Sequence, residues 1–168
     1  MICTVYWVND THAGHIGMMP RPRGGDWLAD EIKSLATQDV DVIVSLLTEG
    51  EMLELELARE GELCAENGIE FVSFPINDRD VPPLDLNLKN FVGSLRDRVS
   101  NGKSVVIHCR AGIGRSAIIA ACLMVSPSNS VEGVMSSIAH ARGLPVPDTN
   151  EQLERVREFA VWRTKDAQ

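Results

Sequence analysis

The segment from His108 to Ser116, with the sequence HCRAGIGRS, constrains the fold of this chain more than any other stretch. A short apolar run, Val105 to Ile107, precedes it, and a longer one, Ala117 to Val125, follows it. Apolar runs of these lengths around a glycine-rich turn predict a buried strand, a tight loop and a buried helix. Any fold of the chain must therefore pass sharply from strand to helix within this segment.

The loop between the predicted strand and helix has the composition of an anion-binding site. Gly112 and Gly114 allow backbone angles closed to other residues, so successive N–H groups can point inward. The N-terminus of the helix adds partial positive charge, and the Arg115 guanidinium offers donors matched to two phosphate oxygens. The predicted phosphate-binding residues are Arg110, Ala111, Gly112, Ile113, Gly114 and Arg115.

Cys109 lies at the start of this loop, where the local positive charge favours a thiolate. Cysteines in such places have pKa values of about 3.5 to 7.5, against about 8.5 for a free thiol, so we predict a nucleophile. Ser116 can donate its hydroxyl to the sulfur or cap the helix. Successive strand side chains point to opposite faces, so His108 is expected to support the loop rather than act as a base on Cys109.

These residues fill every fixed position of the signature H-C-x-x-G-x-x-R-S/T, and the chain resembles the small dual-specificity branch of the protein tyrosine phosphatase superfamily. The resemblance implies hydrolysis of a phosphate monoester through a cysteinyl-phosphate intermediate, without a metal ion or other cofactor. Cys109, Arg115 and Ser116 then belong to the catalytic group. A catalytically silent phosphate-binding module and an RNA 5′-phosphatase are the alternative functions.

A second functional stretch, Phe74 to Pro83, is dense in carboxylates and prolines and follows a predicted strand. If this strand runs parallel to the one before Cys109, both loops leave the same edge of the sheet. The resemblance implies an acid within an aromatic-Pro-x-x-Asp segment, which assigns the general acid to Asp78, with Asp80 as the alternative. Arg79 either steers the leaving group or pairs with a neighbouring aspartate.

Three further side chains are candidates for contact with substrate or water. Arg21 and Arg23 are spaced by a proline and either meet the anionic part of a substrate or remain solvated. Larger phosphatases of the superfamily carry a Gln-Thr-x-Asp-Gln pattern whose glutamines position the hydrolytic water. The matching stretch here keeps only the second of them, Gln152, for which a surface position is an equal alternative.

Composition limits the remaining possibilities. With 168 residues, 44% of them hydrophobic, the chain is expected to form a single catalytic domain over residues 1–168. A net charge of −8 disfavours nucleic acid and membrane surfaces as partners. The charge does not forbid the partner that the resemblance implies, a phosphorylated protein or a small phosphate monoester. Four cysteines without C-x-x-C spacing, and no signal peptide or spanning segment, predict a cytoplasmic protein.

The order of strands and helices predicts an α/β fold, with a central, mostly parallel sheet of about five strands and helices on both faces. In the N-terminal part we expect a strand from Ile2 to Val8, a loop from Asn9 to Gly25 and a helix from Asp26, its cap, to Thr37. Trp27 is expected on the buried face of this helix, in the hydrophobic core of the protein. A second strand covers Val40 to Leu47.

Thr48 and Glu51 have the spacing of a capping box and are expected to open one helix that continues to Glu66. The seven glutamates of Glu49 to Glu66 are then a solvated face. A third strand follows, and later helices are expected to begin after Asp85 and Ser130.

Overall fold

A five-stranded sheet forms the centre of the computed structural model, which describes residues 3–10 and 13–165. The strand order is β1-β2-β5-β3-β4, with β1 antiparallel to β2 and all other pairs parallel. The strands are β1 (Tyr6–Asp10), β2 (His15–Pro20), β3 (Val42–Ser45), β4 (Glu70–Ser73) and β5 (Ser104–Cys109). The prediction of a mostly parallel sheet of about five strands is confirmed.

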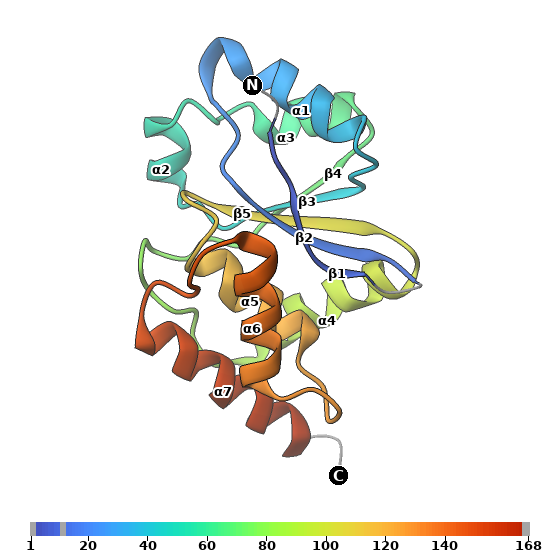
Figure 1. Cartoon of the computed structure of the whole chain (residues 1–168). Coiled ribbons are helices and arrows are strands. Elements are labelled where there is room, and N and C mark those ends of the chain that lie inside the picture. The colour runs from blue at the N-terminus through green and yellow to red at the C-terminus, as the bar shows by residue number, and fades with distance from the viewer. Residues whose placement is uncertain (1–2, 11–12, 166–168) are drawn as a thin grey trace.

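Helices cover both faces of the sheet, as Figure 1 shows. Above it in this view lie α1 (Leu28–Ala36), α2 (Glu49–Glu54) and α3 (Glu60–Glu66). Below it lie α4 (Leu86–Ser100), α5 (Arg115–Met124), α6 (Val131–Arg142) and α7 (Asn150–Lys165). No helix in the described part of the chain is long and apolar enough to cross a membrane.

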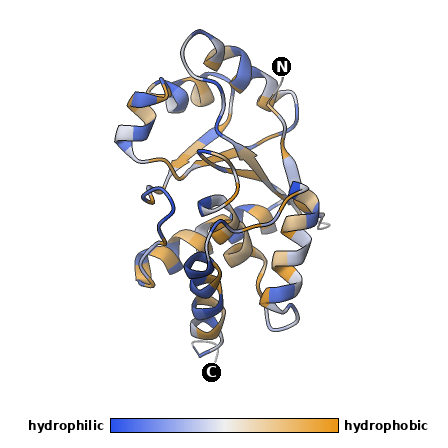
Figure 2. Ribbon diagram, turned by 60° about the vertical axis from the view of Figure 1, so that its left-hand side comes forward, coloured by the Kyte–Doolittle hydropathy of each residue, from blue (hydrophilic) through white to orange (hydrophobic). Residues whose placement is uncertain are grey.

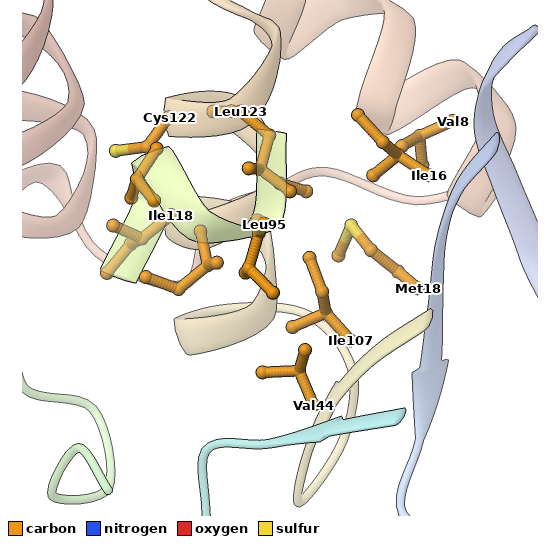
Figure 3. Packing of buried hydrophobic residues seen from close by; sticks show 14 of the residues in the cluster. Val8, Ile16, Met18, Val44, Leu95, Ile107, Ile118, Cys122 and Leu123 are labelled. Atoms are coloured by element: carbon orange, nitrogen blue, oxygen red, sulfur yellow. The ribbon is translucent and has the colours of Figure 1, made fainter. Parts of the chain in front are cut away.

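The two layers of helices enclose two separate hydrophobic clusters, because side chains alternate along each strand. On β5, Val105 and Ile107 belong to the cluster under α4 to α7, whereas Val106 belongs to the one under α1 and α3. Figure 3 shows Ile107 beside Met18 and Leu95 in the first cluster. Hydrophobic residues fill the strands, while α7 carries many hydrophilic ones (Figure 2). Both faces of the central strands are therefore buried.

The loop predicted from Asn9 to Gly25 contains a strand, β2, between β1 and β5, so this prediction is wrong. Met18 and Met19 are both fully buried. A strand that is buried on both faces has a continuous apolar run instead of alternating apolar and polar residues, so it lacks the usual strand pattern. Methionines beside glycine and proline also have little strand propensity. The first strand also begins later than predicted, at Tyr6, and Ile2 lies outside the described residues.

The start of α1 differs from the prediction as well. Asp26 lies in a short 3₁₀ turn, Gly25–Trp27, and the α-helix begins only at Leu28. Trp27 is 57% exposed rather than part of the core, and the Arg23 guanidinium lies 4.5 Å from the centroid of its ring. Such a cation–π contact lets a tryptophan stay at the surface.

The glutamate-rich segment forms two helices instead of one. Thr48 and Glu51 make the predicted capping box at the start of α2. The helix then ends, because Glu56 takes a φ of +57° and Leu57 turns into the core, where it is fully buried. The predicted starts of these two later helices are confirmed: Asp85 caps α4 by accepting from the Leu88 N–H, and Ser130 caps α6 by accepting from an N–H in its first turn.

Candidate active site

The predicted phosphate loop connects the end of β5 to the start of α5, at the carboxyl edge of the parallel strands. Gly112 has a φ of +67°, and a Cβ on it would lie 2.5 Å from the Met19 carbonyl carbon. A Cβ on Gly114 would lie 2.8 Å from Gln152 Oε1. The loop therefore curls tightly against β2 on one side and α7 on the other, and the contact of Gly112 with the β2 backbone needs glycine.

Arg142, the last residue of α6, holds the loop from outside. Its Nε donates to the Gly112 carbonyl at 2.9 Å and its Nη2 to the Ala111 carbonyl at 3.0 Å. The Tyr6 ring lies 4.2 Å from the guanidinium carbon. Because these carbonyls are bonded outward, the intervening peptide N–H groups are free to turn toward the inside of the loop. Sequence reasoning missed Arg142, which is 30 residues from its partner.

Cys109 lies at the base of the loop and is only 3% exposed. Its Sγ is 3.4 Å from the Ser116 hydroxyl. Burial works against ionisation of the thiol, but hydrogen bonds from Ser116 and the Ile113 N–H, together with the charge of Arg115, outweigh it and lower the pKa of Cys109. The structure thus brings the predicted nucleophile and Ser116 together in an environment that favours the thiolate.

His108 lies on the opposite side of β5 from the thiol, as expected, and has a charged partner. Its Nε2 is 2.9 Å from Glu60 Oε1, and both side chains are fully buried. Its Nδ1 lies 3.4 Å from the Cys109 carbonyl oxygen. Burial disfavours a charged imidazole, yet the Glu60 carboxylate offsets that effect and raises the pKa of His108. Glu60 was expected on a solvated face, and that prediction is wrong.

Arg115 is held by a second buried glutamate. Its Nη1 donates to Glu51 Oε2 at 2.8 Å and its Nη2 to Glu51 Oε1 at 2.9 Å, a bidentate pair. Burial of Glu51 opposes its ionisation, but hydrogen bonds from Arg115, the Thr48 N–H and Arg110 lower its pKa to about 2. Glu51, the acidic partner of the capping box of α2, therefore also orients the guanidinium of the phosphate loop, and sequence reasoning missed this second role. Arg110 itself pairs with Glu54 at 3.1 Å.

The loop after β4 lies beside Arg115, as the parallel arrangement predicted. Arg115 Nη1 donates to the Ile76 carbonyl at 2.8 Å, and Nη2 donates to Asp78 Oδ1 at 3.0 Å. The Asp78 side chain is still 57% exposed. The Asp80 carboxylate instead accepts from the N–H of Val81 at 2.8 Å. Of the two candidate acids, Asp78 is the one in contact with the phosphate loop.

Gln152 is fully buried, so its alternative surface position is wrong. It lies on α7 against Gly114 of the phosphate loop. Its Oε1 accepts from the Asp148 N–H at 3.1 Å, and its Nε2 donates to the Asp80 carbonyl at 3.3 Å. The side chain therefore connects the two functional loops. Its role in positioning water stays a prediction.

The three predicted substrate-contacting arginines differ in their surroundings. The Arg21 N–H donates to the Arg110 carbonyl at 3.2 Å, which places the backbone of Arg21 beside the phosphate loop. The Arg23 side chain is engaged by Glu31, with a 2.7 Å bond from Nε to Oε1. Arg79 has a φ of +61° in the loop that carries Asp78 and Asp80. Contact of these arginines with substrate stays a prediction.

The chemistry that this arrangement supports is nucleophilic. A thiol with a lowered pKa at the base of the predicted phosphate loop lies together with a guanidinium fixed by Glu51 and an exposed carboxyl group in contact with that guanidinium. Within residues 3–10 and 13–165, no three His, Cys, Asp or Glu side chains cluster as a metal site requires.

Known proteins are similar to this chain in sequence and in fold. A family model described as a polymorphic toxin system DSP-PTPase phosphatase matches residues 16–128, more than half of the chain. Cyclin-dependent kinase inhibitor 3 of Rattus norvegicus is 30% identical over 132 residues, which cover 77% of this chain and 60% of the relative. The Homo sapiens protein of that name is 29% identical over 132 residues, with the same coverage. The chain thus spans about 60% of the length of these curated relatives.

Solved structures agree with the fold over almost the whole chain. Kinase associated phosphatase, in a crystal structure with its catalytic-site cysteine replaced by serine, matches with a TM-score of 0.87 at 23% identity. The match covers 99% of this chain and 97% of that one. Tk-PTP in its active form matches with a TM-score of 0.76 at 25% identity, covering 94% of this chain and 96% of that one.

Proposed function

Because this chain belongs to the DSP-PTPase phosphatase family, the dual-specificity type of protein tyrosine phosphatase, we propose that it hydrolyses phosphate monoesters with Cys109 as nucleophile. The observation that carries the proposal is the lowered pKa of the Cys109 thiol at the base of a phosphate loop. A thiolate is the reactive form of cysteine, and here it lies where the loop would hold a phosphorus atom.

In the proposed first step, the Cys109 thiolate attacks phosphorus, the bond from phosphorus to the ester oxygen breaks, and Asp78 gives its proton to the departing oxygen. Arg115 and the loop N–H groups from Arg110 to Gly114 bind the equatorial oxygens, where negative charge is concentrated in the transition state. Glu51 already holds the Arg115 guanidinium, which has only to exchange its contact with Asp78 for one with the substrate.

In the second step, Asp78 takes a proton from water, the water oxygen attacks phosphorus, and the bond from sulfur to phosphorus breaks. Ser116, at 3.4 Å from the sulfur, stabilises the thiolate that leaves. His108 supports the same loop through its contact with the Cys109 carbonyl. The contact between Asp78 and Arg115 supports Asp78 over Asp80 as the acid, because it holds Asp78 at the loop where the leaving group departs.

The proposed substrate is a phosphorylated protein or a small phosphate monoester. A net charge of −8 argues against nucleic acid, including RNA 5′ ends, and against anionic membranes. Four free cysteines, Cys3, Cys64, Cys109 and Cys122, support a reducing compartment, and we propose the cytoplasm. The thiols of Cys3, Cys64 and Cys122 have pKa values raised by burial to about 12, so we assign them no part in the reaction.

Hydrolysis of an aryl phosphate, measured against pH with a chelator present, tests the proposal. Cys109→Ser should abolish turnover. Asp78→Ala should lower the rate about 10²-fold or more and flatten the basic limb of the profile, because that limb reports loss of the acid's proton. Normal activity in Asp78→Ala together with loss in Asp80→Ala would move the role to Asp80. No turnover by the parent, with vanadate still bound, would favour the silent phosphate-binding module.

A further inference from the structure

Two side chains of α7 bond to the backbone of the acid loop, here defined as residues 76–82. Gln152 Nε2 donates to the Asp80 carbonyl at 3.3 Å, and Arg155 Nη1 donates to the Pro82 carbonyl. Both carbonyls flank Val81, so the helix holds the C-terminal half of the loop at two neighbouring points. Residues three apart on a helix lie on one face, which explains how both side chains reach the same segment.

The N-terminal half of the acid loop is held from the other side. The Ile76 N–H donates to the Leu46 carbonyl at 3.0 Å, and the Ile76 carbonyl accepts from Arg115 at 2.8 Å. Between the two halves, the Asp80 N–H closes a turn onto the Asn77 carbonyl at 3.0 Å. Asp78 thus lies on a short turn whose two ends are hydrogen-bonded to other elements. One end is bonded to the sheet and to Arg115, and the other end is bonded to α7.

The same helix contacts the phosphate loop. Gln152 is fully buried, and its amide lies so close to Gly114 that a Cβ there would come within 2.9 Å of Nε2. A displacement of Gln152 therefore disturbs the phosphate loop and the acid loop together. Arg155 is farther along the helix, is partly exposed, and is paired with Glu158 at 2.8 Å. It offers a way to loosen the acid loop alone.

We propose that Gln152 and Arg155 form a bracket that positions Asp78 for proton transfer, so that the acid loop is held over the phosphate loop without a bound substrate. The inference rests on the proposed function and deepens it: both residues are positioning residues, acting through the backbone at Asp80 and Pro82. A held acid avoids the cost of ordering the loop in each turnover.

The dependence of the hydrolysis rate on the leaving group measures how well Asp78 is positioned for proton transfer. Proton transfer matters for phenyl phosphate, whose phenolate leaves poorly, and matters little for 2,4-dinitrophenyl phosphate, whose anion leaves unaided. Arg155→Met should lower kcat/KM for phenyl phosphate about tenfold and change kcat/KM for the dinitrophenyl ester less than about twofold, because kcat/KM reports only the steps up to departure of the leaving group. Arg155→Lys, which keeps a positively charged donor group, should recover much of the loss. Arg157→Met is the matched control, because Arg157 lies on the same helix and pairs with Glu132 at its exposed surface.

Hydrogen exchange of the peptide spanning residues 76–82 gives a readout that needs no turnover. Loss of the bracket should speed exchange there in Arg155→Met and leave it unchanged in Arg157→Met. Equal loss of kcat/KM on both esters, or unchanged exchange in the acid loop of a folded Arg155→Met protein, would overturn the bracket. If the parent turns over neither ester, the proposed function fails, and the exchange comparison alone decides whether the bracket holds the loop.

Discussion

Replacing Glu51 by glutamine tests how strongly the carboxylate beneath Arg115 stabilises the fold. The pKa of Glu51 falls from the usual 4.5 to about 2 because, against the effect of burial, Arg115, the Thr48 N–H and Arg110 bind its charged form. One pKa unit is worth about 1.4 kcal/mol, so the ionised carboxylate contributes about 3 kcal/mol to the free energy of unfolding at neutral pH.

The sign of the pH dependence follows from the direction of the change. A depressed pKa stabilises the folded state fully above the unfolded-state value near 4.5, and the contribution disappears as the pH falls toward 2. By linkage, about 1.4 kcal/mol of it remains at about pH 3. Glu51→Gln has no such contribution at either pH, so the stability gap between parent and variant should narrow by about 2 kcal/mol from about pH 7 to about pH 3.

Urea unfolding at the two pH values measures this gap. Glu54→Gln is the matched control, because Glu54 pairs with Arg110 at the exposed edge of the same site, where solvent screens the interaction. Its unfolding curve should follow that of the parent at both pH values. A Glu51→Gln variant whose deficit is the same at both pH values would refute the reasoning, since the deficit would then come from packing or from the unpaired guanidinium rather than from ionisation.

Two further changes test the supports of the phosphate loop from its other sides. Arg142→Ala should weaken vanadate binding about tenfold, since two hydrogen bonds to loop carbonyls are lost, while Arg157→Ala should not; equal vanadate affinity in both would contradict the assignment. Glu60→Gln should lower the pKa of His108, remove positive charge behind the loop and move the midpoint of Cys109 alkylation by iodoacetamide to higher pH. An unmoved midpoint would mean that the buried pair has no electrostatic effect on the thiol.

The features that sequence reasoning predicted are those encoded by neighbouring residues. The residues of the loop from His108 to Ser116 are contiguous in the sequence, and the spacing of its glycines, cysteine and arginine predicts a phosphate-binding loop. The caps at Thr48 and Asp85 also depend on residues three positions apart. Local rules of this kind need no knowledge of the tertiary fold, so they correctly predicted the loop and the starts of the helices that Thr48 and Asp85 cap.

The features that it missed depend on partners distant in the chain. Arg115 and Glu51 are 64 residues apart, and the local spacing of Glu51 from Thr48 predicts only their capping box, not the burial of this carboxylate against Arg115. The strand β2 was missed for a related reason: Met18 and Met19 are buried because strands and helices from elsewhere cover both faces, not because they favour extended backbone. Burial of a charge or of a weak strand former becomes visible only when its partners are placed.

The break between α2 and α3 connects these missed features. In one continuous helix, Glu51 and Glu60 would be nine residues apart, about two and a half turns, and would point to opposite sides. The positive φ at Glu56 ends the first helix and re-aims the second, so that Glu51 reaches Arg115 and Glu60 reaches His108. A single unbroken helix, as the sequence predicts, could bury only one of the two carboxylates against the loop. The local departure from helix propensity is thus what lets two carboxylates support one phosphate loop.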